Sequence, residues 1–185
     1  MSHFFSFFFL VFVSFHVANG SVCSLKNSAI ESSWQVIGDN QLQIQFEHNN
    51  FTTDRWTSIA FGNGPGMTNI EAIIFSRVND VVTTSTGYTP KKKKVVIDSV
   101  PYVTVKNVNL NGNLLKITVT RPLGPAGPRN YSLNKCVNWL ILSGGSMKDG
   151  HLKKHHGGIA TAKNVCANEC KAPSKLQMLR SNRIQ

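Results

Sequence analysis

Two kinds of side chain in this sequence could ligate a metal or a cofactor: a methionine thioether and a group of histidine imidazoles. Met67 stands just after residues 62–66, a run of glycine and proline that neither a strand nor a helix tolerates. Alternating apolar residues lie on both sides of this corner, so residues 56–78 predict a strand, a corner and a second strand. A flexible thioether at the mouth of such a corner is a candidate ligand, although methionine also fills gaps in hydrophobic cores.

The histidines lie in residues 144–158, where glycines flank His151, His155 and His156. On a helix, His151 and His155 would share one face and could chelate zinc. No glutamate lies between them, however, and no third ligand stands nearby in the sequence. The composition of the segment predicts a loop or one short turn, and surface histidines that bind no metal are the alternative.

The sequence shows no catalytic arrangement, and we expect that the protein is not an enzyme. It contains no serine, histidine and aspartate set with a recognisable nucleophile turn, and no evident pair of catalytic carboxylates. Only 9 aspartates and glutamates stand against 20 lysines and arginines. Acid–base catalysis by paired carboxylates is therefore not a leading hypothesis.

Basic residues dominate the charge of the chain, whose formal net charge is +11. They gather in residues 91–94, 148–154 and 171–183, and no aromatic residues are interleaved with them as in a nucleic-acid-binding surface. An acidic partner, an anionic polysaccharide or a membrane surface fits this pattern better, and solubility alone would also explain it. The lysine run at residues 91–94 is more typical of charges that guard the edge of a sheet.

Residues 1–20 predict a secretory signal peptide. A phenylalanine-rich apolar run from Phe4 to Val17 precedes Ala18 and Gly20, small residues at the usual spacing for signal-peptidase cleavage. The run is shorter than the roughly 20 residues that a membrane span needs, and no later segment is apolar enough to span a membrane. We therefore expect a secreted, extracellular protein with one domain at residues 21–170 and a basic, disordered tail at residues 171–185.

Four cysteines in an exported chain predict two disulfides, and this number allows three connectivities. We expect Cys23 to bridge into the C-terminal half. A bond between Cys166 and Cys170 would close a very small loop and add the least stability. The remaining cysteine is Cys136, and the two N-glycosylation sequences begin at Asn50 and Asn130.

From residue 32 onward the hydrophobic period is two, and no long window shows a helical period. The apolar runs cover residues 34–37, 42–46, 56–61, 70–78, 81–86, 95–97, 102–108, 114–120 and 136–142. Eight to ten or more short strands at this spacing predict an all-β fold, an antiparallel β-sandwich. The residues that we expect to be buried between its sheets are Trp34, Phe46, Ile59, Phe61, Ile74, Val103, Val105, Ile117, Val119 and Ile141.

Three segments, in this order, resemble the signatures of the DOMON family. Residues 56–78, with Met67, are similar to its first signature, and residues 117–123 are similar to its strand that ends in arginine. Residues 139–155 are similar to its closing segment. The late cysteines are similar to those of small secreted single-domain members from nematodes. The resemblance covers residues 23–170, with Ala60 where many members carry glycine and with His156 as an additional histidine.

The resemblance implies a β-sandwich that binds a small ligand at one end, either b-type haem or a sugar, and a cofactor-free extracellular interaction domain is the further alternative. In haem-binding members a methionine and a histidine are the axial ligands, at positions that match Met67 and His155, with His156 as the alternative. Filling both axial positions suits electron transfer to a separate redox partner. The apolar neighbours that could line the haem are Trp56, Phe61, Ile73, Phe75 and Trp139.

Overall fold

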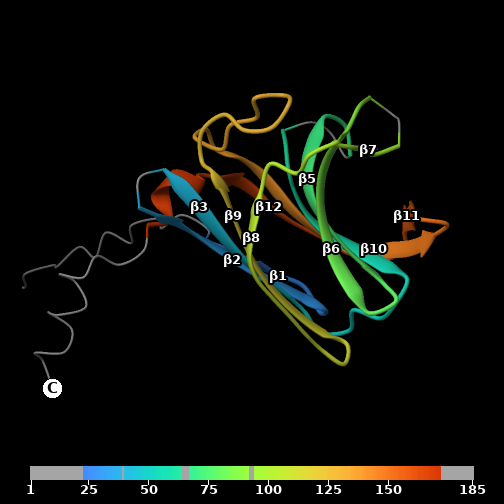
Figure 1. Ribbon diagram of the computed structural model, residues 1–185. Coiled ribbons are helices and arrows are strands. Elements are labelled where there is room, and N and C mark those ends of the chain that lie inside the picture. Colours follow the sequence, from blue (N-terminus) through green and yellow to red (C-terminus); the bar gives the residue numbers. More distant parts are fainter. Residues whose placement is uncertain (1–22, 39, 64–66, 92–93, 172–185) are drawn as a thin grey trace, which may run out of the picture.

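The computed structural model describes residues 23–38, 40–63, 67–91 and 94–171 of the chain. This part forms two β-sheets that pack face to face (Figure 1). The predicted signal peptide lies outside the described residues, and so does the predicted tail beyond Lys171, which forms a β-bridge with Val36. No helix among the described residues is long and apolar enough to cross a membrane.

The smaller sheet has five strands in the order β1-β2-β3-β9-β8, and neighbouring strands are antiparallel. The strands are β1 (Ser24–Lys26), β2 (Ile30–Ile37), β3 (Gln41–His48), β8 (Thr104–Asn111) and β9 (Leu114–Pro122). Gly112 has a φ of +57° in the turn that joins β8 to β9, a conformation that glycine adopts at little cost.

The larger sheet has seven strands, with β11-β10-β4-β5-β6-β7 in sequence and β12 paired to β10. They are β4 (Arg55–Phe61), β5 (Ile70–Val78), β6 (Val81–Thr89), β7 (Val96–Ile97), β10 (Val137–Lys148), β11 (His151–His155) and β12 (Ile159–Val165), and a short 3-10 helix, η1 (Ala167–Glu169), follows. Ile141 of β10 pairs with Ile59 of β4 and with Ala160 of β12, so β11 and β12 follow one another along the same edge of β10. These sheets confirm the predicted antiparallel sandwich.

The core between the sheets contains most of the residues expected there. Trp34 and Trp139 stack with ring centroids 4.0 Å apart, and Phe61 meets the Trp139 ring edge-on at 4.7 Å. Val103 is only half-buried. The prediction for Val105 was wrong, because β8 is an edge strand whose side chains are largely exposed, and Val105 itself is 42% exposed.

The central strands of the larger sheet, β4 and β5, are buried on both faces. Every residue of β5 from Ile70 to Arg77 is buried. Ile73 and Phe75 point into the core between the sheets, whereas Ile74 belongs to a separate cluster on the opposite face. Ile74 is therefore buried as expected, but not between the two sheets.

Two disulfides fasten the ends of the domain. Cys23 bonds to Cys170, across 147 positions of sequence, and Cys136 bonds to Cys166, across 30 positions. The expectation that Cys23 bridges into the C-terminal half is confirmed. The first bond joins the residue just before β1 to the residue just after η1, so the two ends of the described domain lie together.

Residues 144–158, for which composition predicts a loop, are instead largely strand. β10 continues through this segment, a two-residue turn follows, and β11 returns beside it. Gly144 has a φ of +88°, and a Cβ there would lie 1.5 Å from the carbonyl oxygen of Trp56, so glycine permits β10 to pass this close to β4. Asp149 and Gly150 both have positive φ, as a type I′ hairpin turn requires.

Candidate functional site

The candidate site is the outer face of the larger sheet. We define the outer-face cluster as its seven buried apolar residues: Trp56, Ala60, Ile70, Ala72, Ile74, Leu140 and Leu142. Four half-buried side chains pack against this cluster from neighbouring segments: Met67, Val95, Met147 and Leu152. Ligand sites are lined mostly by apolar side chains with a few polar groups, so this face is the first place to look for one.

Met67 is positioned by the tight corner between β4 and β5. A Cβ on Gly62 would lie 2.9 Å from the carbonyl oxygen of Asn69, so the two ends of the corner approach more closely than a larger residue allows. The backbone N–H of Asn69 donates to the carbonyl oxygen of Thr89 at 2.8 Å, and that of Ile70 donates to the Thr89 hydroxyl at 3.2 Å. These contacts fix the start of β5 and hold the half-buried Met67 beside the outer-face cluster.

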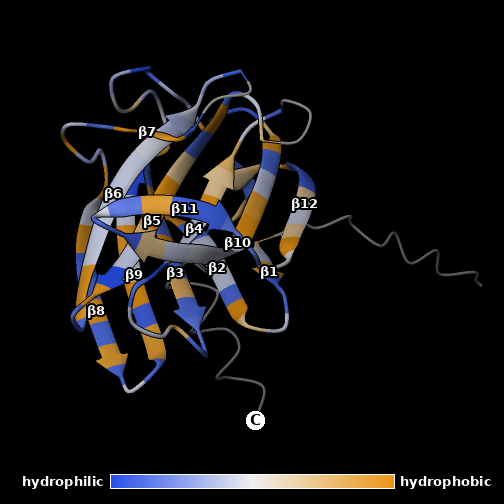
Figure 2. Cartoon of the chain, turned by 90° about the vertical axis from the view of Figure 1, so that its right-hand side faces the viewer, coloured by the Kyte–Doolittle hydropathy of each residue, from blue (hydrophilic) through white to orange (hydrophobic). Residues whose placement is uncertain are grey.

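His155 is positioned by the β10–β11 hairpin. It pairs with Gly145, which also pairs with Trp56 of β4, and the indole N–H of Trp56 donates to the carbonyl oxygen of Lys153 at 2.9 Å. Figure 2 looks onto this face and shows β11 crossing in front of β4 and β5. His155 is half-buried, whereas His156 is exposed.

The structure therefore brings Met67 and the hairpin that carries His155 to the same face of the same sheet. Met67 packs directly against the outer-face cluster. His155 lies on β11, and this strand is hydrogen-bonded to Trp56 of the cluster through the carbonyl oxygen of Lys153. No three histidine, cysteine, aspartate or glutamate side chains of the described residues gather as a site for a metal ion alone would require. A ligand site here would have to rely on one thioether, one imidazole and apolar contacts.

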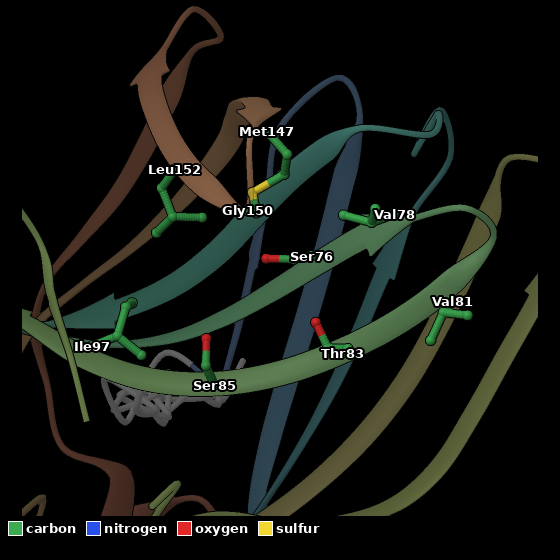
Figure 3. Close-up of a pocket in the computed structure, with 9 residues that line it drawn as sticks. All are labelled: Ser76, Val78, Val81, Thr83, Ser85, Ile97, Met147, Gly150 and Leu152. Carbon is green, nitrogen blue, oxygen red and sulfur yellow. The ribbon is translucent and has the colours of Figure 1, made fainter. Parts of the chain in front are cut away.

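A pocket of about 350 Å³ lies between the hairpin and the outer face of β5 and β6. Its lining residues are Ser76, Val78, Val81, Thr83, Ser85, Ile97, Met147, Gly150 and Leu152. In Figure 3 the hydroxyl oxygens of Ser76, Thr83 and Ser85 point into the space below Met147 and Leu152. Neither Met67 nor His155 lines this pocket, so it adjoins the pair of candidate ligands without containing them.

A buried ion network lies on the opposite side of β5, facing the space between the sheets. Arg129 donates to the carboxylates of Glu71 and Asp98, with Nη2 to Glu71 Oε2 at 2.8 Å and Nη1 to Asp98 Oδ1 at 2.7 Å. Burial alone would raise the pKa of Asp98, but hydrogen bonds from Arg129 and Thr86 outweigh it and lower that pKa. Burial and the nearby Glu71 carboxylate raise the pKa of Tyr102, whose hydroxyl donates to Glu71.

The profile of the DOMON domain matches residues 26–145. The chain belongs to the DOMON family. A DOMON domain-containing protein of Caenorhabditis briggsae is 59% identical over 179 residues, covering 96% of this chain and 95% of that protein. A second DOMON domain-containing protein, from Caenorhabditis elegans, is 56% identical over 173 residues, covering 93% of this chain and 94% of that protein. The profile match includes Met67 and ends before His155.

Two solved structures share the DOMON fold of this chain at low sequence identity. The cytochrome domain of Myriococcum thermophilum cellobiose dehydrogenase superposes with a TM-score of 0.58 and 11% identity, over 80% of this chain and 79% of that chain. The cytochrome b domain of pyranose dehydrogenase from Coprinopsis cinerea gives a TM-score of 0.54 and 12% identity, over 84% of each chain. These likenesses show the fold.

The outer face of this DOMON domain carries residue types that a flat apolar cofactor requires. Ser58, Ala60 and Ala72 are small, buried side chains on paired positions of β4 and β5 and on the same face. Larger apolar side chains of the outer-face cluster surround them. Met67 and His155 supply the two donor types that a low-spin haem uses.

Of the five apolar residues that could line a haem, one lies on the outer face of the larger sheet. Phe61, Ile73, Phe75 and Trp139 lie in the core between the sheets, and only Trp56 belongs to the outer-face cluster. Both faces of β4 and β5 are apolar, so alternation alone cannot tell which face meets the second sheet. Sequence reasoning also missed Met147 and Leu152, because they lie in the segment for which a loop is predicted.

Proposed function

We propose that this DOMON domain is an extracellular b-type haem protein that transfers electrons, with Met67 and His155 as the axial ligands. The observation that supports the proposal most directly is the packing of Met67 and of the β10–β11 hairpin on one apolar cluster with a floor of small residues. The likeness to two cytochrome domains gives the fold a precedent for this use.

In this proposal each part of the chain has a defined task. The corner at Gly62 and the bonds to Thr89 hold Met67 on one side of the apolar face. The hydrogen bond from the Trp56 indole to the carbonyl oxygen of Lys153 holds the hairpin, which carries His155, on the other side of this face. Haem, when bound, would supply a one-electron centre, and ligation of its iron by both Met67 and His155 would favour electron transfer over reaction with oxygen.

The visible spectrum of the full chain, produced in a secretory host that is supplied with haem, tests the proposal. We expect a sharp Soret band, and resolved α and β bands after reduction with dithionite, because thioether and imidazole ligation gives low-spin iron. A protein without a Soret band would contradict the proposal. A glycan-array screen would then separate the two alternatives, a sugar-binding domain and a cofactor-free interaction domain.

We also propose that the chain is secreted and is N-glycosylated at Asn50 and Asn130, and a second measurement tests this. Asn50 and Asn130 are both exposed, so each is accessible to the glycosylation machinery. We expect the chain in the medium of a eukaryotic secretory host, and we expect peptide-N-glycosidase to lower its apparent mass in two steps. Asn50→Gln and Asn130→Gln should each remove one step. A secreted protein whose mass the enzyme leaves unchanged would contradict the glycosylation proposal.

A further inference from the structure

The pocket beneath the hairpin has a polar floor and an apolar roof. On the floor, Ser76 and Thr83 are directly paired residues of β5 and β6, and Ser85 lies two residues further along the same face. On the roof, Met147 and Leu152 are directly paired residues of the hairpin. Two matched cross-strand pairs therefore face one another across about 350 Å³.

The floor presents hydroxyl groups that have no partner within the described chain. None of the hydroxyls of Ser76, Thr83 and Ser85 takes part in a hydrogen bond among the described residues, in contrast to the neighbouring Thr86, which donates to Asp98 at 2.7 Å. Ser76 is only 7% exposed as a residue, and its hydroxyl points into the pocket. A hydroxyl that faces a pocket and has no protein partner is available to donate to water or to a ligand.

The surroundings of the pocket favour a negatively charged ligand. None of its nine lining residues is charged. The hairpin that forms its roof carries Lys148, Lys153 and Lys154 with a single acid, Asp149, and all four side chains are exposed. Lys94, also exposed, precedes β7, whose Ile97 lines the pocket. The acids close to the pocket are Asp149, Asp54 and Asp80, and Asp80 is paired with Arg77, so the surrounding lysines favour an anion over a cation.

We infer that this pocket is a binding site for a small amphiphilic carboxylate such as a medium-chain fatty acid, separate from the proposed haem ligands. The cross-strand hydroxyls of Ser76 and Thr83 would donate to the two carboxylate oxygens, and the aliphatic chain would lie against Met147 and Leu152. If each non-hydrogen atom with its hydrogens occupies about 30 Å³, as a water molecule does, the pocket of about 350 Å³ accommodates about a dozen such atoms. Decanoate has this size.

Isothermal titration calorimetry of the purified full chain with decanoate tests the inference. We expect one binding site, and we expect decanol to bind at least about tenfold more weakly because it lacks the charge that strengthens hydrogen bonds from the hydroxyls. Decanoate that does not bind would overturn the inference, and equal binding of decanol would overturn its preference for an anion. Glucose that binds where decanoate does not would point to a sugar site instead.

Variants locate the site within the fold. Ser85→Phe fills the pocket and should abolish decanoate binding, and Thr83→Val, which keeps the shape but removes a hydroxyl, should weaken it by about tenfold. Thr161→Val, on the exposed side of β12, is the matched control and should change nothing. If Ser85→Phe does not fold, the double variant Ser76→Ala/Thr83→Val makes the same test. Decanoate affinity that survives removal of both hydroxyls unchanged would overturn the assignment.

A final comparison separates this inference from the proposed haem function. Met67→Leu and His155→Ala alter side chains that do not line the pocket, so both should leave decanoate affinity unchanged in the haem-free protein. Loss of decanoate binding in these variants would overturn the claim of a separate site. A failure of haem to bind to the wild type would contradict the proposed function and leave the decanoate result standing on its own.

Discussion

His155→Ala is expected to abolish the low-spin spectrum of the haem-loaded protein. The imidazole is half-buried on β11, and Ala cannot ligate iron, so the α and β bands of the reduced protein should disappear and most haem should be lost on gel filtration. Met67→Leu keeps an apolar side chain of similar volume but removes the sulfur, so it should leave weakly bound or high-spin haem. The measurement is the visible spectrum of each variant before and after reduction.

Two matched controls sharpen this experiment. His156→Ala removes an exposed imidazole but keeps the backbone bond from its N–H to the carbonyl oxygen of Gly144, so the low-spin spectrum should persist. Met147→Leu removes the other thioether that packs against the outer-face cluster, and it should also leave the spectrum unchanged. If His156→Ala loses the spectrum and His155→Ala keeps it, the ligands have been assigned to the wrong histidine. If Met147→Leu loses it, the sulfur ligand is on the hairpin.

The fold could be predicted from the sequence because the hydrophobic pattern that specifies each strand lies within a short stretch of consecutive residues. A hydrophobic period of two, repeated in short runs, specifies strands, and many short strands specify a sandwich. The sequence did not show which face of the larger sheet each side chain of the central strands occupies. In β5 both sets of alternating residues are apolar, since Ile73 faces the second sheet and Ile74 faces the outer cluster, and no local pattern distinguishes them.

The β10–β11 hairpin was not predicted because its glycines are required by tertiary contacts that the sequence does not show. Gly144 and Gly145 suggest a loop by composition, yet each lies where a Cβ would collide with backbone of β4 or β11. The turn itself had a local indication, since Asp149-Gly150 is a favoured type I′ pair. The hydroxyls of the pocket carried no indication at all, because serine and threonine are ordinary residues on the open face of a strand.

Arg129→Ala is expected to be the most destabilising of the proposed substitutions outside the outer face. Arg129 holds two carboxylates whose side chains are almost completely buried, Glu71 at 5% exposure and Asp98 at 3%. It also covers the ring of Tyr88, with its guanidinium carbon 4.2 Å from the ring centroid. Removal of the cation leaves two buried negative charges without compensation, which should cost about 3–5 kcal/mol at neutral pH.

The pH dependence distinguishes this cause from simple loss of packing. The pKa of Asp98 is lowered in the native state, so its contribution to wild-type stability is present above the unfolded value of about 4 and is lost as the pH falls below it. In Arg129→Ala, protonation of Asp98 at low pH relieves part of the uncompensated charge. The difference in unfolding free energy between wild type and variant should therefore be largest near pH 7 and shrink toward pH 4.

Urea denaturation of the disulfide-intact proteins at pH 7 and pH 4, followed by tryptophan fluorescence, measures this difference. Arg129→Lys is the control, since it keeps the charge but loses the planar fork that bonds both carboxylates, and it should cost less than the alanine variant. In the Arg129→Ala background, Glu71→Gln and Asp98→Asn should each recover part of the lost stability by removing one buried charge. A cost below about 1 kcal/mol at pH 7, or a cost that does not change with pH, would mean that Arg129 does not compensate the charge of this buried network.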